Sequence, residues 1–394
     1  MSADPIQTVR RRRVFYIPGY DPIHPRRYRE LYRTEGAEQA AISGYDLALK
    51  PKGQKGGRYG WHVDAQIEGA QIETRFDVLV WSDIVRASME TGILGTYRQL
   101  FSTAWTYIGS GALRRLMKLR IGPVIAALYP IVFLLVQAML ACAAAGLIGW
   151  GLSWITPWLA PLGLAVVPVI LTWFRKNDHR FYAYYLMHDY AYSAQSKGAI
   201  PPELAARMAE FTDEIAAVIA ADEVDEVLVV GHSSGAHLAV SIFADLLRDN
   251  RIATDGPVVG FLSLGQVVPM VSFLPDAWQL RRDLRVLGSS QDLAWVDVTA
   301  PGDGCSFALC DPVAVSGVAA PDQSAPLVFS AAFTQTLSDE KMATLERRYF
   351  RLHFQYLCAF DRPKDYDYFQ ITAGPMTLKD RYKNRPASRS TKRA

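Results

Sequence analysis

A serine placed between two glycines is the feature of the sequence that most clearly suggests chemistry. An apolar, β-branched stretch over residues 227–230 runs into Gly231-His-Ser-Ser-Gly235, and an amphipathic helical pattern follows over 235–248. A tight turn from a strand into a helix needs small residues two positions before and after its central serine, because larger side chains would collide there. Such a turn exposes the serine hydroxyl above the sheet, at a helix N-terminus that favours a developing negative charge. We therefore predict that Ser233 is a nucleophile; the plainer alternative is a glycine-rich connection whose serine caps the helix.

This turn, written Gly-His-Ser-x-Gly, resembles the nucleophile elbow of the α/β-hydrolase superfamily, and in particular that of its lipases and esterases. The resemblance extends from Val14 to about His353, apart from an uncharged central segment, and the elbow is its most specific part. It implies an α/β fold with a mostly parallel sheet flanked by helices. It also implies a catalytic serine, acid and histidine that follow one another in this order along the chain.

The general base is the next residue to assign. A serine hydroxyl is a weak nucleophile until an imidazole accepts its proton, and a carboxylate must orient that imidazole. Of the seven histidines, two follow Ser233 in the sequence, His237 and His353. His237 lies one helical turn beyond the serine, so the chain order that the resemblance implies leaves His353 as the base. Its surroundings are typical of a helix, which departs from the family's common pattern, and a packed histidine near Asp361 is the alternative.

The acid is expected just after a strand. Residues 294–298 form a predicted strand that runs into Ala300-Pro-Gly-Asp303-Gly-Cys, which places an acidic residue in a tight turn past the strand end. The resembled superfamily presents its carboxylate at such a position, so Asp303 is the expected acid. Asp297, inside the strand, and Asp311, after another turn, are the alternatives, and Asp303 could also be an ordinary turn aspartate.

The oxyanion hole would use backbone amides. The first predicted strand, 14–17, ends in Pro-Gly-Tyr20-Asp, where the superfamily commonly has a His-Gly loop that donates an N–H group. Proline replaces that histidine here. We expect the amides of Tyr20 and Ser234 to form the hole, although any residue of 19–21 could supply the first donor. His232, beside the nucleophile, is expected to pack within the turn.

The uncharged central segment predicts membrane spans. Residues 121–174 contain no Asp, Glu, Lys, Arg or His, although charged residues make up 21% of the chain. A transmembrane helix needs roughly 20 apolar residues, so we predict two spans, over 124–148 and 162–174; buried core helices and a re-entrant hairpin are the alternatives. Basic residues on both flanks would place both ends, and the catalytic domain, in the cytoplasm at an inner or plasma membrane. Residues 93–108 are expected to lie on the membrane surface before the first span.

Short β-branched runs alternate with helical patterns on both sides of this segment. The chain therefore divides into an N-terminal part of the hydrolase domain (1–110), a transmembrane hairpin (111–180), the remainder of the hydrolase domain (181–375) and a basic disordered tail (376–394). Glycines within 53–57 separate two edge strands, 45–50 and 59–68, of a predicted antiparallel hairpin. The other predicted strands are 14–17, 76–81, 227–230, 258–264, 294–298 and 327–330, and the predicted helices are 26–42, 202–221, 235–248, 275–287 and 339–357.

Composition limits the possible partners. The net charge of +3 is small for 394 residues, and the basic residues gather near the two ends, at 10–13 and 379–393. This placement favours an anionic membrane surface over nucleic acid. The four cysteines show no CxxC pair, so we expect neither a disulfide framework nor a metal site, and no cofactor. Residues 1–13 are polar and basic, so we expect no cleavable secretory signal.

These patterns predict a membrane-anchored serine hydrolase that cleaves a carboxylic ester with Ser233, His353 and Asp303. The hairpin would lie among membrane lipids and keep the site near acyl chains, so the expected substrate is a lipid or another acyl ester. A thioesterase or an acyltransferase would use the same residues, and a non-catalytic scaffold or binding protein that keeps the fold is the rival class.

Overall fold

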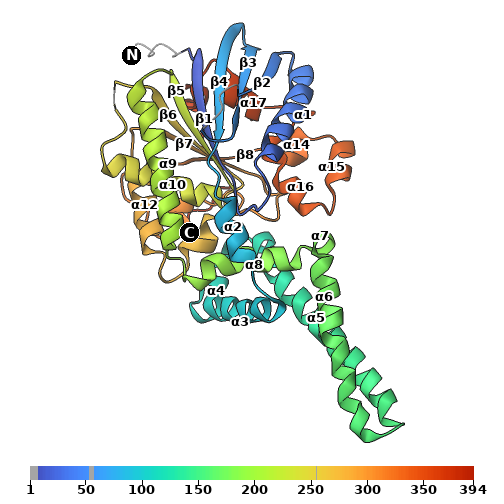
Figure 1. Cartoon of the computed structure of the whole chain (residues 1–394). Helices are drawn as coiled ribbons and strands as arrows, with labels where there is room; N and C mark the ends of the chain where they lie inside the picture. Colours follow the sequence, from blue (N-terminus) through green and yellow to red (C-terminus); the bar gives the residue numbers. More distant parts are fainter. Residues whose placement is uncertain (1–7, 53–56, 254) are drawn as a thin grey trace.

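An eight-stranded sheet forms the centre of the protein in a computed structural model, which describes residues 8–52, 57–253 and 255–394 (Figure 1). The strand order is β2-β3-β4-β1-β5-β6-β7-β8. The strands β4, β1, β5, β6, β7 and β8 run parallel, whereas β2, β3 and β4 pair antiparallel. The strands are β1 (Arg11–Ile17), β2 (Asp46–Pro51), β3 (Gly60–Ile67), β4 (Ala70–Val78), β5 (Glu226–His232), β6 (Val258–Leu264), β7 (Ala294–Thr299) and β8 (Leu327–Ser330).

Strand β5 occupies the middle of the sheet, between β1 and β6, and every one of its residues is buried. A parallel strand covered on both faces reads as a continuous apolar run, which explains the sequence pattern before the predicted nucleophile. Strands β2 and β3 form the antiparallel edge hairpin that the sequence predicts, with Leu47 opposite Ala65. The predicted turn at 53–57 lies largely outside the described residues.

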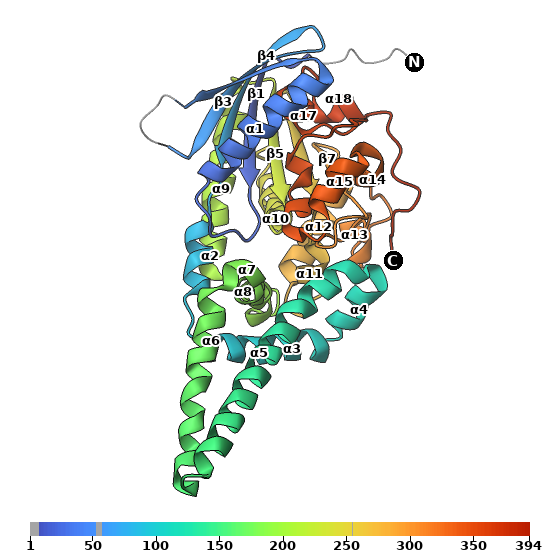
Figure 2. The same cartoon turned by 90° about the vertical axis from the view of Figure 1, so that its right-hand side faces the viewer.

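Helices cover both faces of the sheet, and neighbouring residues of one strand face opposite layers. Phe15 and Ile17 of β1 pack with α9 (Pro202–Ala221), α10 (Gly235–Arg248) and α12 (Trp278–Ser289). Val14 and Tyr16 face the other layer, which contains α1 (Arg26–Ser43), α17 (Tyr368–Ala373) and α18 (Leu378–Tyr382). The fold is therefore α/β, with three layers (Figure 2). Shorter helices connect these parts: α2 (Ser82–Met89), α11 (Val268–Ser272), α13 (Pro312–Val315), α14 (Phe333–Thr336), α15 (Asp339–Leu345), α16 (Tyr349–His353) and η2 (Gln355–Leu357).

A group of helices lies beneath the carboxyl ends of the parallel strands and ends in a long projecting hairpin (Figures 1 and 2). The helices are α3 (Ile93–Gly109), α4 (Ala112–Leu119), α5 (Ile121–Ser153), η1 (Pro157–Ala165), α6 (Val166–Lys176), α7 (Asp178–Phe181) and α8 (Ala183–Gln195). Two helical stretches, of 33 and 20 residues, are long and apolar enough to cross a membrane: Ile121–Ser153 and Pro157–Lys176. Leu100, Leu134 and Met187 form a shared core, so α3 and α8 pack against the base of the hairpin.

Small residues bring the two arms of the hairpin together. A Cβ atom added to Gly163 would lie 2.3 Å from the carbonyl oxygen of Ala145, and one added to Gly149 would lie 2.6 Å from that of Ala160. Ala141, Ala145 and Gly149 are buried along α5, at intervals of four residues. This small-residue spacing is typical of helices that approach closely within a membrane.

Two predictions about the C-terminal region are wrong. Residues 339–357 do not form one helix, because Arg347 adopts a left-handed φ of 60° and separates α15 from α16. Residues 376–394 are not a disordered tail, because buried carboxylates bind the segment: Leu378 N donates to Glu226 (2.6 Å), and the Arg393 guanidinium lies 3.4 Å from Asp311. Lys392 N also donates to the carbonyl of Leu309 (2.7 Å).

Two of the four N-terminal arginines, Arg12 and Arg13, pair with carboxylates of the sheet. Arg12 is buried and pairs with Glu226 at 2.5 Å, across the β1–β5 junction, and Arg13 pairs with Asp77. Figure 1 shows the start of β1 at the end of the sheet far from the hairpin. These charges therefore stabilise the sheet.

Candidate functional site

Ser233 lies in the sharp turn between β5 and α10, with the backbone conformation of a strained elbow. Its φ is 55°, in the left-handed region that non-glycine residues rarely adopt. The glycines two positions before and after it have no room for a side chain. A Cβ on Gly231 would lie 2.8 Å from the Cα of Ala236, and one on Gly235 would lie 2.1 Å from the carbonyl oxygen of Ile17. The turn therefore packs directly against the helix and against β1, as the sequence predicts.

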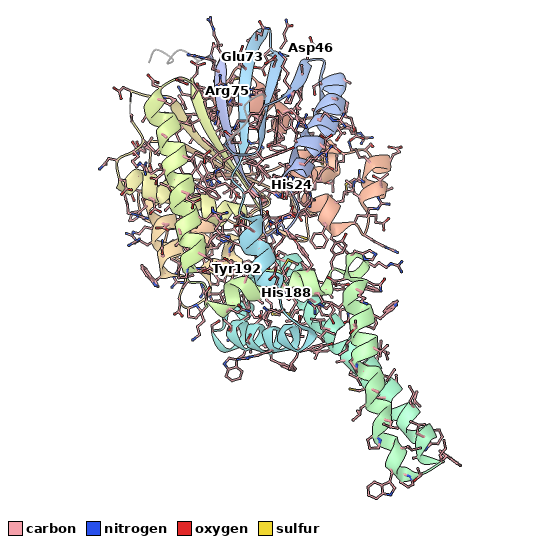
Figure 3. The ribbon with its side chains drawn as sticks, viewed as in Figure 1. His24, Asp46, Glu73, Arg75, His188 and Tyr192 are labelled. Atoms are coloured by element: carbon pink, nitrogen blue, oxygen red, sulfur yellow. The ribbon has the colours of Figure 1, made fainter. Side chains whose placement is uncertain are left out.

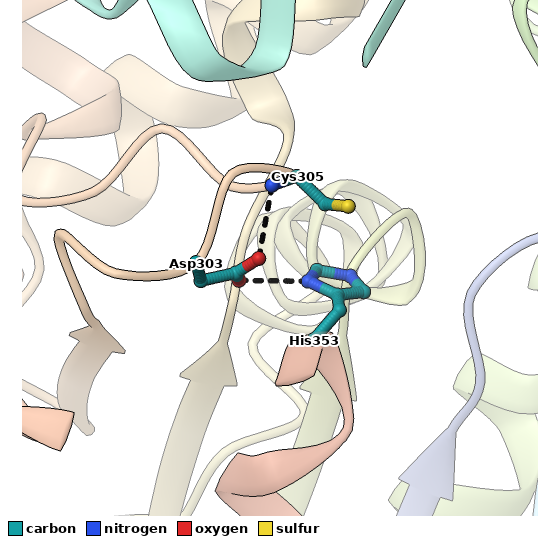
Figure 4. A group of neighbouring side chains, drawn as sticks. All are labelled: Asp303, Cys305 and His353. Atoms are coloured by element: carbon teal, nitrogen blue, oxygen red, sulfur yellow. Dashed lines mark hydrogen bonds and ion pairs between the residues drawn. The ribbon is translucent and has the colours of Figure 1, made fainter. Parts of the chain in front are cut away.

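His353 and Asp303 form a hydrogen-bonded pair, although they come from distant elements. His353 ends α16, and Asp303 lies in the turn after β7. The Nδ1 atom of His353 is 2.7 Å from Oδ2 of Asp303, and both residues are buried (Figure 4). The other carboxylate oxygen accepts a hydrogen bond from the backbone N–H of Cys305 at 2.9 Å. This arrangement holds the imidazole in the tautomer that leaves Nε2 available to accept a proton.

Ser233 and His353 meet the same turn after β6, and the described residues show no direct hydrogen bond between them. A Cβ atom on Gly265 would lie 3.0 Å from Cε1 of His353, and the preceding residue, Leu264, accepts the hydrogen bond from Ser233 N at 2.9 Å. The rings of His232 and His353 have centroids 4.8 Å apart. Within the described chain, Ser233 Oγ has no hydrogen bond, and the residue is partly exposed. In serine enzymes without substrate, the hydrogen bond between the serine and its base is often long or poorly aligned.

Electrostatics favour an ionised Asp303 and a neutral His232. Burial alone would raise the pKa of Asp303, but the charge of His353 and hydrogen bonds from His353, Cys305 and Ser306 outweigh it and lower the pKa below its usual value. Burial, together with the charge of His353, lowers the pKa of His232 to about 3. The neutral His232 ring therefore donates from Nε2 to the carbonyl of His353 at 3.0 Å. His232 thus links the elbow to the backbone of His353.

The loop after β1 reaches Ser233. A Cβ atom on Gly19 would lie 3.0 Å from the Cβ of Ser233 and 3.4 Å from its Oγ. Two contacts hold this loop: Trp81 Nε1 donates to the Pro18 carbonyl (2.9 Å), and Tyr185 Oη donates to the Tyr20 carbonyl (2.5 Å). No acceptor within the described residues binds the backbone N–H of Tyr20 or of Ser234. The two N–H groups predicted to form an oxyanion hole therefore have no competing acceptor in the described part of the chain.

The alternative acids and the alternative histidine have other surroundings. Asp297 is buried in β7 and bonds Ser263 at 2.6 Å, and burial raises its pKa to about 8. Asp311 caps α13 through the N–H groups of Val313 and Ala314. His237 lies in α10, where burial lowers its pKa to about 4. Of the three candidate acids, Asp303 is the one that pairs with His353.

The same cluster could be interpreted as a metal site. Ligand atoms of Asp303, Cys305 and His353 lie within 4.8 Å of one another (Figure 4). Metal binding would require a thiolate, whereas burial and the charge of Asp303 raise the pKa of Cys305 well above its usual value. The carboxylate of Asp303 already accepts bonds from His353, Cys305 and Tyr356. The donor set therefore fits an acid–base pair better than a metal centre.

Two further tyrosines contribute to the site and were not predicted from the sequence. Tyr356, in η2, donates from its hydroxyl to Oδ2 of Asp303 at 3.0 Å, and its oxygen accepts from Ala300 N at 2.9 Å. Tyr185, in α8, is the second, because it holds the Tyr20 carbonyl. No motif marks either tyrosine; the position of Tyr356 three residues after His353 is the one local signal.

Comparison with known proteins assigns the chain to no family. No family model, no curated protein and no solved structure matches it. The fold is α/β with a mostly parallel eight-stranded sheet, and two helices are long and apolar enough to span a membrane.

Proposed function

We propose that the protein is a membrane-anchored serine hydrolase of the α/β-hydrolase type that cleaves a carboxylic ester. The observation that carries this proposal is the left-handed Ser233 at the β5–α10 turn, beside an imidazole that a buried carboxylate orients. What supports a functional role for this strained residue is its position, on a strand-to-helix turn between two glycines that have no room for a side chain. The His353–Asp303 pair adds the acid–base chemistry that an activated serine requires.

The proposed reaction follows from the positions of these groups. His353 Nε2 removes the proton of Ser233 Oγ as the oxygen attacks the acyl carbon, and the carbonyl oxygen becomes an oxyanion facing the N–H groups of Tyr20 and Ser234. The proton then passes from His353 to the departing alcohol as the ester C–O bond breaks. Water attacks the acyl-serine in the same way, which releases the carboxylic acid and restores Ser233. Asp303 stays ionised and stabilises the imidazolium in both halves.

Membrane anchoring is supported by more than the hairpin. On α3, the exposed side chains include Leu94 (85% exposed), Phe101 and Trp105 (79%), whereas Gln99 and Thr103 are buried. Several large apolar side chains exposed together on one helix are unusual at a water-facing surface. Basic residues before α5 and after α6 favour the cytoplasmic side of an inner or plasma membrane for the catalytic domain.

One observation favours the rival class, a binding module that keeps the fold without catalysis. Ser233 Oγ has no hydrogen bond to His353 within the described chain. An activated serine and an inert one predict different reactivity toward electrophiles, so the two classes can be separated without knowing the substrate.

Labelling by a fluorophosphonate probe is the experiment that tests the proposal. Detergent-solubilised wild type should label at Ser233, and Ser233→Ala should not. Asp303→Asn should label about 10⁴-fold more slowly, because the imidazole would take the wrong tautomer. Ser102→Ala, at an exposed serine of α3, is the control and should label normally. A folded wild type that does not label would support the binding module instead.

A further inference from the structure

Helix α8 presents a polar and aromatic face to the proposed active site. Tyr185, Asp189 and Tyr192 follow one another at intervals of four and three residues, so they lie along one side of the helix. Tyr185 binds the Tyr20 carbonyl, and the ring of Tyr192 lies 5.8 Å from that of Tyr20 and 6.2 Å from that of Trp81. Figure 3 shows Tyr192 and His188 on this helix, beneath the sheet.

The other side of α8 packs against the base of the hairpin. His188 Nδ1 is 2.8 Å from the side-chain oxygen of Gln99 on α3, and Met187 packs with Leu100 and Leu134. The contacts on its two sides therefore fix the rotation of α8, and Asp189 faces the site together with the tyrosines.

Asp189 is a carboxyl group without a partner. Within the described residues, it forms neither a hydrogen bond nor an ion pair, although its neighbours on the helix do. Burial raises its pKa to about 7, and the charge of His353 opposes this rise. The other groups within electrostatic range are hydroxyls and a thiol: Tyr20, Tyr107, Tyr185, Tyr190 and Cys305. Asp189 is itself partly exposed, so its carboxylate is enclosed by these groups and still open to a ligand. An enclosed carboxylate normally has a cationic or hydrogen-bonding partner, and the described residues supply none.

We propose that Asp189 and the aromatic rings of Tyr20, Tyr185 and Tyr192 bind a positively charged ammonium group of the substrate, close to the ester that Ser233 attacks. An ammonium ion suits this surface on two counts, because a carboxylate attracts it and because electron-rich aromatic faces do so too. Apart from the proposed base His353, no cation within the described residues is in electrostatic contact with Asp189. This inference rests on the proposed function, and it narrows the substrate to acyl esters that carry an amine or a quaternary ammonium.

A matched pair of esters tests the inference directly. Butyrylcholine and 3,3-dimethylbutyl butyrate have the same shape, but only the first carries a positive charge. In wild type, kcat/KM should be at least about tenfold higher for the charged ester, since a desolvated cation–π contact and an ion pair each contribute at that level. Asp189→Asn should remove most of this preference, so that the ratio of the two kcat/KM values falls toward one. Asp213→Asn, at an exposed carboxylate of α9, is the control for overall charge.

Binding without turnover separates this inference from the proposed function. Calorimetry with benzyltrimethylammonium on the detergent-solubilised full chain should show binding in wild type and at least tenfold weaker binding in Asp189→Asn. Hydrolysis of the neutral ester with no charge preference and no binding would overturn the inference alone. Binding without hydrolysis or fluorophosphonate labelling would overturn the enzyme and keep the ammonium site.

Discussion

Tyr356 and His353 bind the same oxygen of Asp303, at 3.0 Å and 2.7 Å. A hydrogen bond to a charged carboxylate contributes about 1.5–3 kcal/mol, so its loss would weaken the ionised form of Asp303 and its hold on the imidazole. Tyr356→Phe should therefore slow fluorophosphonate labelling by about tenfold to a hundredfold. Tyr382→Phe, which removes another buried tyrosine hydroxyl far from the pair, should label at the wild-type rate. Equal rates in all three proteins would exclude a role for Tyr356.

Gly19 leaves no room for a side chain beside the nucleophile. Alanine there would place its Cβ 3.0 Å from the Cβ of Ser233, so either the serine or the loop must move. Displacements on the order of 1 Å can cost about 10²-fold in rate, so we expect Gly19→Ala to slow labelling by at least about tenfold. Gly92→Ala, where no atom lies within 4 Å, is the matched control. Unchanged labelling would show that the loop does not contact the reacting serine.

His232 is expected to act as a positioning residue through its bond to the His353 carbonyl. His232→Ala removes the donor and should lower kcat for the neutral ester by about tenfold with little change in KM, because a misplaced base slows the chemical step. His232→Gln keeps an N–H at a similar reach and should recover most of the rate. If alanine and glutamine behave alike, the hydrogen bond does not position His353.

Asp189 should make stability depend on pH in a particular direction. Its pKa is about 7 in the folded protein and about 3.9 in an unfolded chain. The folded state therefore binds the proton more tightly, and stability falls as pH rises from about 4 to about 7. Asp189→Asn cannot titrate, so its melting temperature should exceed that of wild type by an amount that grows across this range. The Asp213→Asn control should show no such trend, and a constant difference for Asp189→Asn would contradict the raised pKa.

The exposed face of α3 should lie within the membrane interface. A nitroxide attached to Trp105→Cys, in protein reconstituted into vesicles, should be more accessible to oxygen than to a water-soluble nickel chelate. The same label at the exposed residue Glu346, introduced as Glu346→Cys, should show the opposite preference. An equal preference for the chelate at both positions would mean that water, and not lipid, covers this helix.

The elements that could be predicted from the sequence are those that a short stretch of residues determines. The apolar run of β5, the elbow glycines and the amphipathic α10 each have a pattern that a short window contains. The edge hairpin was predicted from the glycines that separate its two strands. Strand β4 was predicted only from residue 76 onward. In residues 70–75, exposed polar side chains (Gln71, Glu73 and Arg75) alternate with buried ones. Half-covered strands of this kind have a weaker apolar signal.

The contacts that complete the candidate site could not be predicted because they join distant parts of the chain. Asp303 and His353 were chosen from order along the chain, whereas their 2.7 Å contact depends on the break at Arg347 that ends one helix and starts another. Asp189 lies in a helix whose sequence carries no motif, and its lack of a partner is visible only in three dimensions. The tail was predicted as disordered because its charges read as solvated, whereas Glu226 and Asp311 bind it.

The pairing of β1 with β5 limits when the sheet can fold during synthesis of the chain. Arg12 and Glu226 face each other across this junction, but 214 positions separate them in the sequence. A ribosome therefore synthesises the whole projecting hairpin before β1 can receive its neighbour and before the elbow exists. During that interval β1 has β4 on one side and an open edge on the other, a state prone to aggregation. Early capture of the emerging hairpin by a bilayer would keep such half-made sheets apart, so anchoring would protect biogenesis as well as place the finished protein.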